Sequence, residues 1–271
     1  MKAKFKLMIM MTCLVLVLAG QIKAQERPKF LTITTIHWNQ DYENFSMDDW
    51  KALEKEYFDK VTMKNEYIVS ATVLNHYFTA DNTEIKIVTG YSSWENIEKA
   101  GMRSDELAKE AWPDEKAREE FFKKQSAYYT NMHSDEIYST IEGAKMMAEK
   151  PTKPMVYYIR VSHRSFPEDG KPEEFQALRK EYKENVIDKN QYIKGYYPSV
   201  HAWGSDSRDF IEAMAVESLT DLQLSMEENQ KLVKAHWPDE KKSDEFFEKM
   251  ERYMTGFHAD YIFRHVPELT K

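Results

Sequence analysis

Cysteine is almost absent from this chain: among 271 residues the only one is Cys13. Glycine and proline are also scarce, at eight and nine residues, which excludes a collagen-like or low-complexity chain. Positive charge is in deficit, with 38 Lys and Arg against 46 Asp and Glu, so the chain lacks the basic surplus with which proteins bind nucleic-acid backbones. Apolar residues make up 42% and aromatic residues 13%, and this supply predicts a globular fold with a substantial core.

The first 24 residues have the pattern of a secretory signal peptide. Three lysines precede an apolar run from Leu7 to Ala19, and small residues lie close to a cleavage point after Ala24. The run is shorter than the ~20 residues that a membrane-spanning helix needs. We therefore expect a periplasmic or secreted protein with no integral membrane span after cleavage. A lipid anchor at Cys13 is the less favoured alternative, because this residue lies inside the apolar run and not at its end.

Removal of this segment limits the chemistry of the mature chain. It takes away four of the 38 basic residues and no acidic one, which leaves 34 against 46, a formal charge of -12. It also removes the only thiol. Disulfides, a thiolate nucleophile and cysteine-ligated metal are thereby excluded, so stability must come from core packing.

The remaining sequence repeats itself with an offset of 125 residues. The segment Trp112–Lys116 recurs as Trp237–Lys241. Large residues coincide at the same offset, among them Phe121 with Phe246, Tyr128 with Tyr253, His133 with His258 and His76 with His201. The repeat predicts two homologous domains, 28–148 and 153–271. A segment with two prolines, 150–154, joins them.

Both repeats show the same succession of hydrophobic periods. A run rich in β-branched and aromatic residues predicts a first strand, and apolar residues at steps of three and four then predict a helix. Two strands separated by a turn, two helices and a last strand follow, which gives the order β-α-β-β-α-(α)-β. The predicted strands cover 30–38, 66–79, 84–92 and 135–141 in the first repeat, and 155–161, 191–203, 209–217 and 260–266 in the second.

This element order, with segments such as Asp209–Ala213 leading into Ser218–Thr220, resembles the dimeric α+β barrel superfamily. Antibiotic-biosynthesis-monooxygenase-like, NIPSNAP-like and EthD-like proteins and haem-handling relatives share that design. The resemblance implies an α+β fold of two tandem ferredoxin-like β-α-β-β-α-β domains. Their four-stranded antiparallel sheets would face each other as an intramolecular α+β barrel, in a monomer or a homodimer. No catalytic signature of any one member is matched.

Alternation along the strands of the second repeat suggests a binding site. We expect the small side chains of Ala213 and Ala215 to lie beneath the helices, which directs Glu212 into the barrel. The same rule turns Arg160 inward together with Tyr158. The predicted ligand-binding residues are Tyr158, Arg160, Tyr197, His201, Trp203 and Glu212.

The first-repeat counterparts of Arg160 and Glu212 are Thr35 and Ile87. Only the second repeat would therefore hold a polar cluster, as expected of a single site in an otherwise apolar barrel. Two alternatives remain open: the two side chains form a buried ion pair, or a one-residue register error has exchanged the two faces of the strand.

Two His-x-Asp segments are weak candidates for metal ligands. His133 and Asp135, and likewise His258 and Asp260, lie on the same side of an extended segment. Two ligands are too few for a metal, so a capping or loop-tethering role is preferred and no metal is expected.

Three classes of function fit these features. The preferred one is binding of an unknown small molecule in the barrel of the second repeat, with a cofactor-independent, oxygenase-like enzyme as its catalytic form. The second is a haem-binding protein that uses His76, His133, His201 or His258. The third is a non-enzymatic envelope scaffold. Phosphate-binding loops, hydrolase triads and metalloprotease helices are not seen in the sequence.

Overall fold

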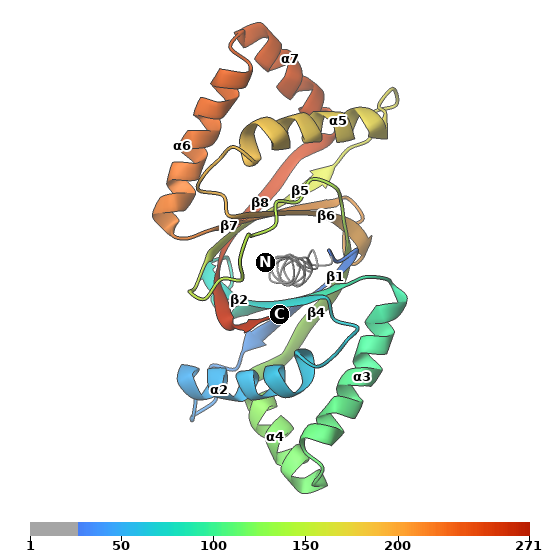
Figure 1. The fold of residues 1–271 in the computed structure, drawn as a ribbon, viewed down its shortest axis with the longest axis vertical. Coiled ribbons are helices and arrows are strands. Elements are labelled where there is room, and N and C mark those ends of the chain that lie inside the picture. Colours follow the sequence, from blue (N-terminus) through green and yellow to red (C-terminus); the bar gives the residue numbers. More distant parts are fainter. Residues whose placement is uncertain (1–26) are drawn as a thin grey trace, which may run out of the picture.

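The computed structural model describes residues 27–271, so the predicted signal peptide and Cys13 lie outside the described part. Within it, eight strands form one closed antiparallel barrel in the order β1-β3-β2-β8-β5-β7-β6-β4, and six α-helices surround the barrel (Figure 1). The predicted α+β class and barrel are confirmed. No helix between residues 27 and 271 is long and apolar enough to cross a bilayer.

The order of elements is the same in the two halves. The first half contains β1 (Phe30–Trp38), α2 (Met47–Tyr57), the π-helix η1 (Phe58–Thr62), β2 (Ser70–Phe78), β3 (Glu84–Tyr91), α3 (Glu95–Ala111), α4 (Glu115–Ala127) and β4 (Tyr129–Thr140). The second contains β5 (Val156–Arg164), α5 (Pro172–Tyr182), η2 (Lys183–Ile187), β6 (Gly195–Trp203), β7 (Asp209–Val216), α6 (Leu219–His236), α7 (Glu240–Glu251) and β8 (Met254–Thr270).

Each half contributes four neighbouring strands to the barrel. Their orders, β4-β1-β3-β2 and β8-β5-β7-β6, correspond strand by strand, which is consistent with a two-domain ferredoxin-like fold. The halves meet where β2 pairs with β8 and where β4 pairs with β6. Because both outer strands of each half are paired in this way, the barrel leaves no free sheet edge.

The sequence offset of 125 residues holds for most elements but not for the first strand. The bounds of α2, η1, β2 and β3 shift by 125 to give those of α5, η2, β6 and β7, whereas β1 shifts by 126 to give β5. The strand pairing shows the same slip, since Ile33 lies opposite Val88 and Ile159 lies opposite Ala213. The connection from β5 to α5 is therefore one residue shorter than the one from β1 to α2.

Helices cover the outside of the barrel, with α2, α3 and α4 on one side and α5, α6 and α7 on the other (Figure 1). The repeated Trp-Pro-Asp-Glu segment begins α4 and α7. Asp114 caps the first of these by accepting a hydrogen bond from the amide of Ala117 at 2.8 Å. Trp112 packs on Phe121 with ring centroids 4.1 Å apart. The segment thus has a structural role as an anchored helix start.

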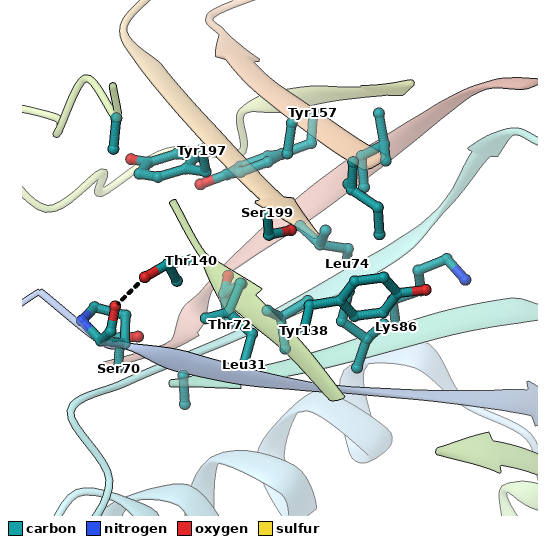
Figure 2. A pocket seen from close by; sticks show the side chains of 18 of the residues that line it. Leu31, Ser70, Thr72, Leu74, Lys86, Tyr138, Thr140, Tyr157, Tyr197 and Ser199 are labelled. Atoms are coloured by element: carbon teal, nitrogen blue, oxygen red, sulfur yellow. Dashed lines mark hydrogen bonds between the residues drawn. The ribbon is translucent and has the colours of Figure 1, made fainter. Parts of the chain in front are cut away.

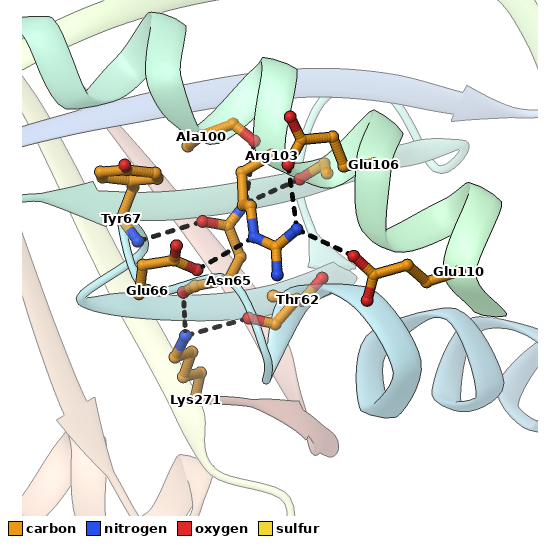
Figure 3. Close-up of polar contacts among 10 residues, drawn as sticks. Thr62, Asn65, Glu66, Tyr67, Ala100, Arg103, Glu106, Glu110 and Lys271 are labelled. Carbon is orange, nitrogen blue, oxygen red and sulfur yellow. Dashed lines mark hydrogen bonds and ion pairs between the residues drawn. The ribbon is translucent and has the colours of Figure 1, made fainter.

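A buried amide orders the loop after η1 (Figure 3). Asn65 is fully buried, and its Nδ2 donates to the carbonyl of Ala100 at 2.8 Å while its Oδ1 accepts from the amide of Tyr67 at 3.1 Å. Asn190 makes the equivalent contacts to Ser225 and Tyr192 in the second half. These asparagines fix the loops that enter β2 and β6, so they help to position the inner face of the barrel.

Candidate functional site: the barrel cavity

The barrel encloses a cavity of about 470 Å³. Strands from both halves line it. The site is therefore shared by the two halves, whereas the sequence predicted a site in the second repeat alone. Its aliphatic wall consists of Leu31, Ile33, Leu74, Val88, Ile159, Val161, Ile211 and Ala213. Figure 2 shows Tyr157 and Tyr197 of the second half across the cavity from Leu31 and Thr72 of the first. The barrel is therefore hollow and not filled by its own side chains.

The predicted inward face of β5 and β7 was wrong. Tyr157, Ile159 and Val161 line the cavity on β5, and Ile211 and Ala213 line it on β7. Alternation then turns the side chains between them outward. The expectation placed Ala213 and Ala215 beneath the helices. In the folded chain Ala213 lines the cavity, and Ala215 packs in the same cluster as Tyr157 and Ile159. Larger side chains fill the space under the helices.

Arg160 and Tyr158 consequently meet Asp260 on the outside of the barrel. The guanidinium makes a two-point contact, with Nε to Oδ1 at 2.8 Å and Nη2 to Oδ2 at 3.3 Å, and the Tyr158 hydroxyl donates to Oδ1 at 2.5 Å. This ion pair is about 40% exposed on both sides. Arg160 and Glu212 lie opposite each other in the strand register but make no ion pair within the described residues.

Glu212 lies beneath α5, where it accepts a hydrogen bond from the Tyr196 hydroxyl. Burial, followed by the charge of Glu212, raises the pKa of Tyr196 well above its ordinary value. The first-half counterpart of Glu212 is Ile87, as the sequence indicated. The counterpart of Arg160 is Thr34 and not Thr35, because β1 and β5 are related by 126 residues.

The three β6 residues of the predicted site separate. Tyr197 lines the cavity, whereas Trp203 is 69% exposed at the end of the strand. His201 lies opposite Tyr138 of β4 and does not line the cavity; its Nε2 is buried without a hydrogen-bond partner among the described residues. Of the six predicted ligand-binding residues, only Tyr197 reaches the cavity.

Four tyrosines add hydroxyl groups to the largely aliphatic wall of the cavity. Tyr138, Tyr157, Tyr197 and Tyr261 come from β4, β5, β6 and β8. Burial raises the pKa of each of these phenols above its ordinary value. They remain protonated at neutral pH. The Tyr138 proton goes to Glu136 or Asp209, and the other three hydroxyls can donate hydrogen bonds to a bound molecule.

Acidic side chains gather at the end of the cavity where β3 and β7 begin. Glu84 pairs with Lys86 at 2.6 Å. The Tyr138 hydroxyl lies 3.0 Å from Glu136 Oε2 and 3.2 Å from Asp209 Oδ2. A single hydroxyl proton serves one of these acceptors at a time, so this end of the cavity is rich in acceptors.

The predicted site did not include the lining residues of the first half, because the polar pair on which it depended, Arg160 and Glu212, occurs only in the second repeat. The signal that finds them is aliphatic alternation: Leu31 and Ile33 on β1 follow the same period as Ile159 and Val161 on β5. Strands that line an apolar cavity have the same alternation of aliphatic residues as strands that pack in a solid core, so the pattern alone does not distinguish the two.

The two His-x-Asp segments lie on the outer face of the barrel. Imidazole and carboxylate are 3.4 Å apart in His133–Asp135 and 3.5 Å apart in His258–Asp260, and all four side chains are at least 38% exposed. Asp135 accepts a hydrogen bond from Thr34. At the equivalent position of the second half, Asp260 accepts one from Arg160. Neither pair acquires a third ligand within residues 27–271.

The cavity does not fit a histidine-ligated haem. Its described lining contains no histidine, and the four histidines proposed from the sequence lie elsewhere.

Known proteins resemble this chain in fold and not in sequence. No protein-family model and no curated protein matches the sequence. A proposed monooxygenase from Lactobacillus acidophilus superposes with a TM-score of 0.53 at 6% identity, over 90% of this chain and 96% of that one. A proposed monooxygenase from Fusobacterium nucleatum gives 0.52 at 11% identity, over 88% and 93%. A chlorite dismutase variant from Candidatus Nitrospira defluvii gives 0.52 at 11% identity, over 90% and 94%. The chain therefore shares the ferredoxin-like α+β barrel fold of these proteins.

Proposed function

We propose that this protein binds a small, largely apolar molecule inside the barrel. The observation that carries the proposal is the cavity of about 470 Å³ with an aliphatic wall and four tyrosine hydroxyls. Its volume falls in the range of about 300–1,000 Å³ found for small-molecule sites. Apolar walls with a few placed polar groups bind by burial and select by hydrogen bonding. A ligand with a ring or chain body, an oxygen acceptor for a tyrosine hydroxyl and a donor for the acidic end would match this lining.

The catalytic form of this proposal is cofactor-independent, oxygenase-like turnover of the bound molecule. The fold shared with two proposed monooxygenases supports it by analogy. We further propose that residues 28–148 and 153–271 are tandem ferredoxin-like repeats, and that residues 1–24 direct export to the periplasm or the medium. A scaffold role without a ligand is less favoured because the barrel is hollow.

Probe binding to the barrel tests the proposal directly. The fluorescent probe 1-anilinonaphthalene-8-sulfonate should bind the folded chain at one saturable site. Ala213→Phe, which places a ring in the cavity, should weaken binding by at least about tenfold, or 1.4 kcal/mol. Ala52→Phe on the exposed face of α2 is the matched control and should leave the affinity unchanged. Equal affinities for the two variants would place the probe outside the barrel and contradict the proposal.

Mass spectrometry of the purified native chain identifies the natural ligand class. We expect an additional mass that A213F no longer retains. Oxygen uptake by the ligand-loaded chain in an oxygen electrode then tests turnover, and a rate equal to that of A213F would contradict the oxygenase-like form while leaving the binding proposal standing.

A further inference from the structure

Three potential metal ligands converge where β5 ends and β7 begins. His163 Nε2 lies 3.4 Å from Asp206 Oδ2 and 3.4 Å from Asp209 Oδ1. The three ligand atoms lie within 4.8 Å of one another, and no other group of three such residues occurs in the part of the chain that the structure describes. Periodicity along the chain does not reveal this set, because Asp206 and Asp209 are 43 and 46 residues from His163 and only strand pairing joins them.

Asp209 carries an oxygen without a hydrogen-bond donor. Its side chain is only 10% exposed, and its Oδ2 accepts from Tyr138, but its Oδ1 accepts no hydrogen bond from residues 27–271 and faces His163. No lysine or arginine of these residues pairs with it. An almost buried carboxylate normally has a cationic partner, because desolvating an unpaired charge is costly. Among the described residues, His163 is the only charged or chargeable partner within ion-pair distance.

The two separations from His163 suit a metal better than a direct contact. A charge-assisted N–H···O hydrogen bond is about 2.7–2.9 Å long, which is shorter than either His163 distance. Ligand atoms at about 2.0–2.1 Å from a tetrahedral ion are about 3.3–3.4 Å from one another. The His163 ring stacks on Phe257 with centroids 4.1 Å apart, so its orientation is held.

Arg208 supports the third ligand. Its Nε and Nη2 donate to the two oxygens of Asp206 at 2.9 and 2.6 Å. Outer hydrogen bonds of this kind commonly orient a ligating carboxylate, and Oδ2 keeps a lone pair for a metal.

The first half contains an equivalent cluster, in which a lysine pairs with the carboxylate that corresponds to Asp209. His37 lies 3.1 Å from Asp81, and Glu84 occupies the position of Asp209. Lys86 pairs with Glu84 at 2.6 Å, whereas Ile211 stands at the corresponding position of β7. The Thr83 hydroxyl also contacts His37 at 3.1 Å and Asp81 at 2.6 Å. The first-half carboxylates are thus satisfied by the protein, and Asp209 is not.

We propose that His163, Asp206 and Asp209 bind one divalent transition-metal ion of the zinc class. One imidazole and two carboxylates favour Zn²⁺, Co²⁺ or Mn²⁺ over Mg²⁺ or Ca²⁺, which prefer all-oxygen sites. Because Asp209 also lines the cavity, an ion held there lies at the cavity end and would act as a Lewis acid toward a bound molecule. The site stands independently of the organic ligand proposed above.

Metal titration of the chelator-treated full chain tests the site. Calorimetry with Zn²⁺ should show one equivalent bound, and Co²⁺ should develop the visible absorption of a low-symmetry site. Asp206→Asn and His163→Gln should each weaken Zn²⁺ binding by at least about tenfold. His37→Gln in the first-half counterpart is the matched control and should leave the affinity within about twofold, as additivity of distant sites implies.

Circular dichroism separates lost ligands from lost folding. Asp206 is partly exposed, at 27%, so D206N should retain the native spectrum even if substitution of the more buried Asp209 does not. Absence of saturable binding to the native chain would overturn the proposal. So would equal Zn²⁺ affinities in D206N and the native chain, or preference for Mg²⁺ over Zn²⁺. None of these outcomes would alter binding of the fluorescent probe to the barrel.

Discussion

Lys145 and Lys271 occupy corresponding positions in the two halves, and each caps a π-helix of the other half. Lys145 Nζ donates to the carbonyls of Ile187, Asp188 and Asn190 at 3.1, 3.3 and 3.0 Å. Lys271 Nζ donates to those of Thr62 and Asn65 at 3.0 and 2.6 Å (Figure 3). A lysine suits these positions because the last carbonyls of a helix lack intrahelical donors and carry partial negative charge. These lysine contacts join the two halves at the ends of their π-helices, in addition to the strand pairing in the barrel.

Removal of either lysine contact should destabilise the whole chain. Lys145→Met keeps most of the aliphatic stem but leaves three carbonyls without their donor. Hydrogen bonds to charged groups contribute about 1.5–3 kcal/mol each, and exposure to water offsets part of this, so we expect a loss of about 1–3 kcal/mol in the free energy of unfolding. Urea denaturation followed by circular dichroism measures it. Lys116→Met on the exposed face of α4 is the control, and an equal effect there would show that the cap has no role.

Gly195 makes room for the cavity residue Tyr197. A Cβ at position 195 would lie 2.6 Å from the Tyr197 hydroxyl oxygen and 2.8 Å from its ring. Gly195→Ala should therefore displace the ring, cost about 1–3 kcal/mol of stability and weaken probe binding in the barrel.

Gly101 provides the opposite case for the same substitution. It lies within α3, and a Cβ there would meet nothing within 4 Å. Gly101→Ala should stabilise the chain by about 0.4–1 kcal/mol, because alanine favours helix and restricts the unfolded chain. Thermal unfolding of both variants distinguishes the two effects; stabilisation by G195A would contradict the placement of Tyr197.

His265 should make stability depend on pH. It is 1% exposed, and burial lowers its pKa to about 4, with Glu268 opposing and Lys150 reinforcing the shift. The unfolded chain binds this proton near the ordinary pKa of about 6.5, and the folded chain does not, so stability falls as the pH drops from about 6.5 to about 4. The full contribution is about 3 kcal/mol, since each unit of difference in pKa corresponds to about 1.4 kcal/mol.

His265→Gln isolates that contribution from the titration of carboxylates. The free energy of unfolding of the native chain, measured in urea at pH 7 and pH 5, should fall more steeply than that of the variant. Parallel curves would mean that His265 is protonated equally in both states. Its Nε2 lies 2.6 Å from the Thr270 hydroxyl, a contact that the neutral ring can make and that Gln can replace.

Arg160 should be dispensable for binding in the barrel. Its pair with Asp260 is on the outer face and partly exposed, so Arg160→Ala should cost at most about 1 kcal/mol of stability. Probe affinity should change by less than about twofold, whereas Tyr157→Phe removes a hydroxyl from the cavity and should change it more. A tenfold loss of probe affinity in R160A would contradict this prediction and show that Arg160 contributes to the binding site.

The sequence predicted the strands of the barrel correctly but not which face of each strand points inward. The aromatic and β-branched runs predicted the strands because period-2 alternation is local, and the α+β class followed from their order. The same alternation misassigned Arg160 and Glu212, since two exchanged faces of a strand have identical periods and only packing distinguishes them. The one-residue slip between β1 and β5 was also invisible, because the offset of 125 holds in the elements that follow, from α2 to β3.

The acidic balance, the lack of thiols in the predicted mature chain, the internal repeat and the kinds of elements could all be read from the sequence. Each depends on composition or on neighbours along the chain. The folded chain was needed to show that the barrel is hollow and that Tyr197 faces the cavity while Arg160 does not. It alone brought His163 to Asp206 and Asp209, and Lys271 to Thr62. These relationships depend on register and closure between distant strands, where contacts are set by the packing of the whole barrel and not by local periodicity.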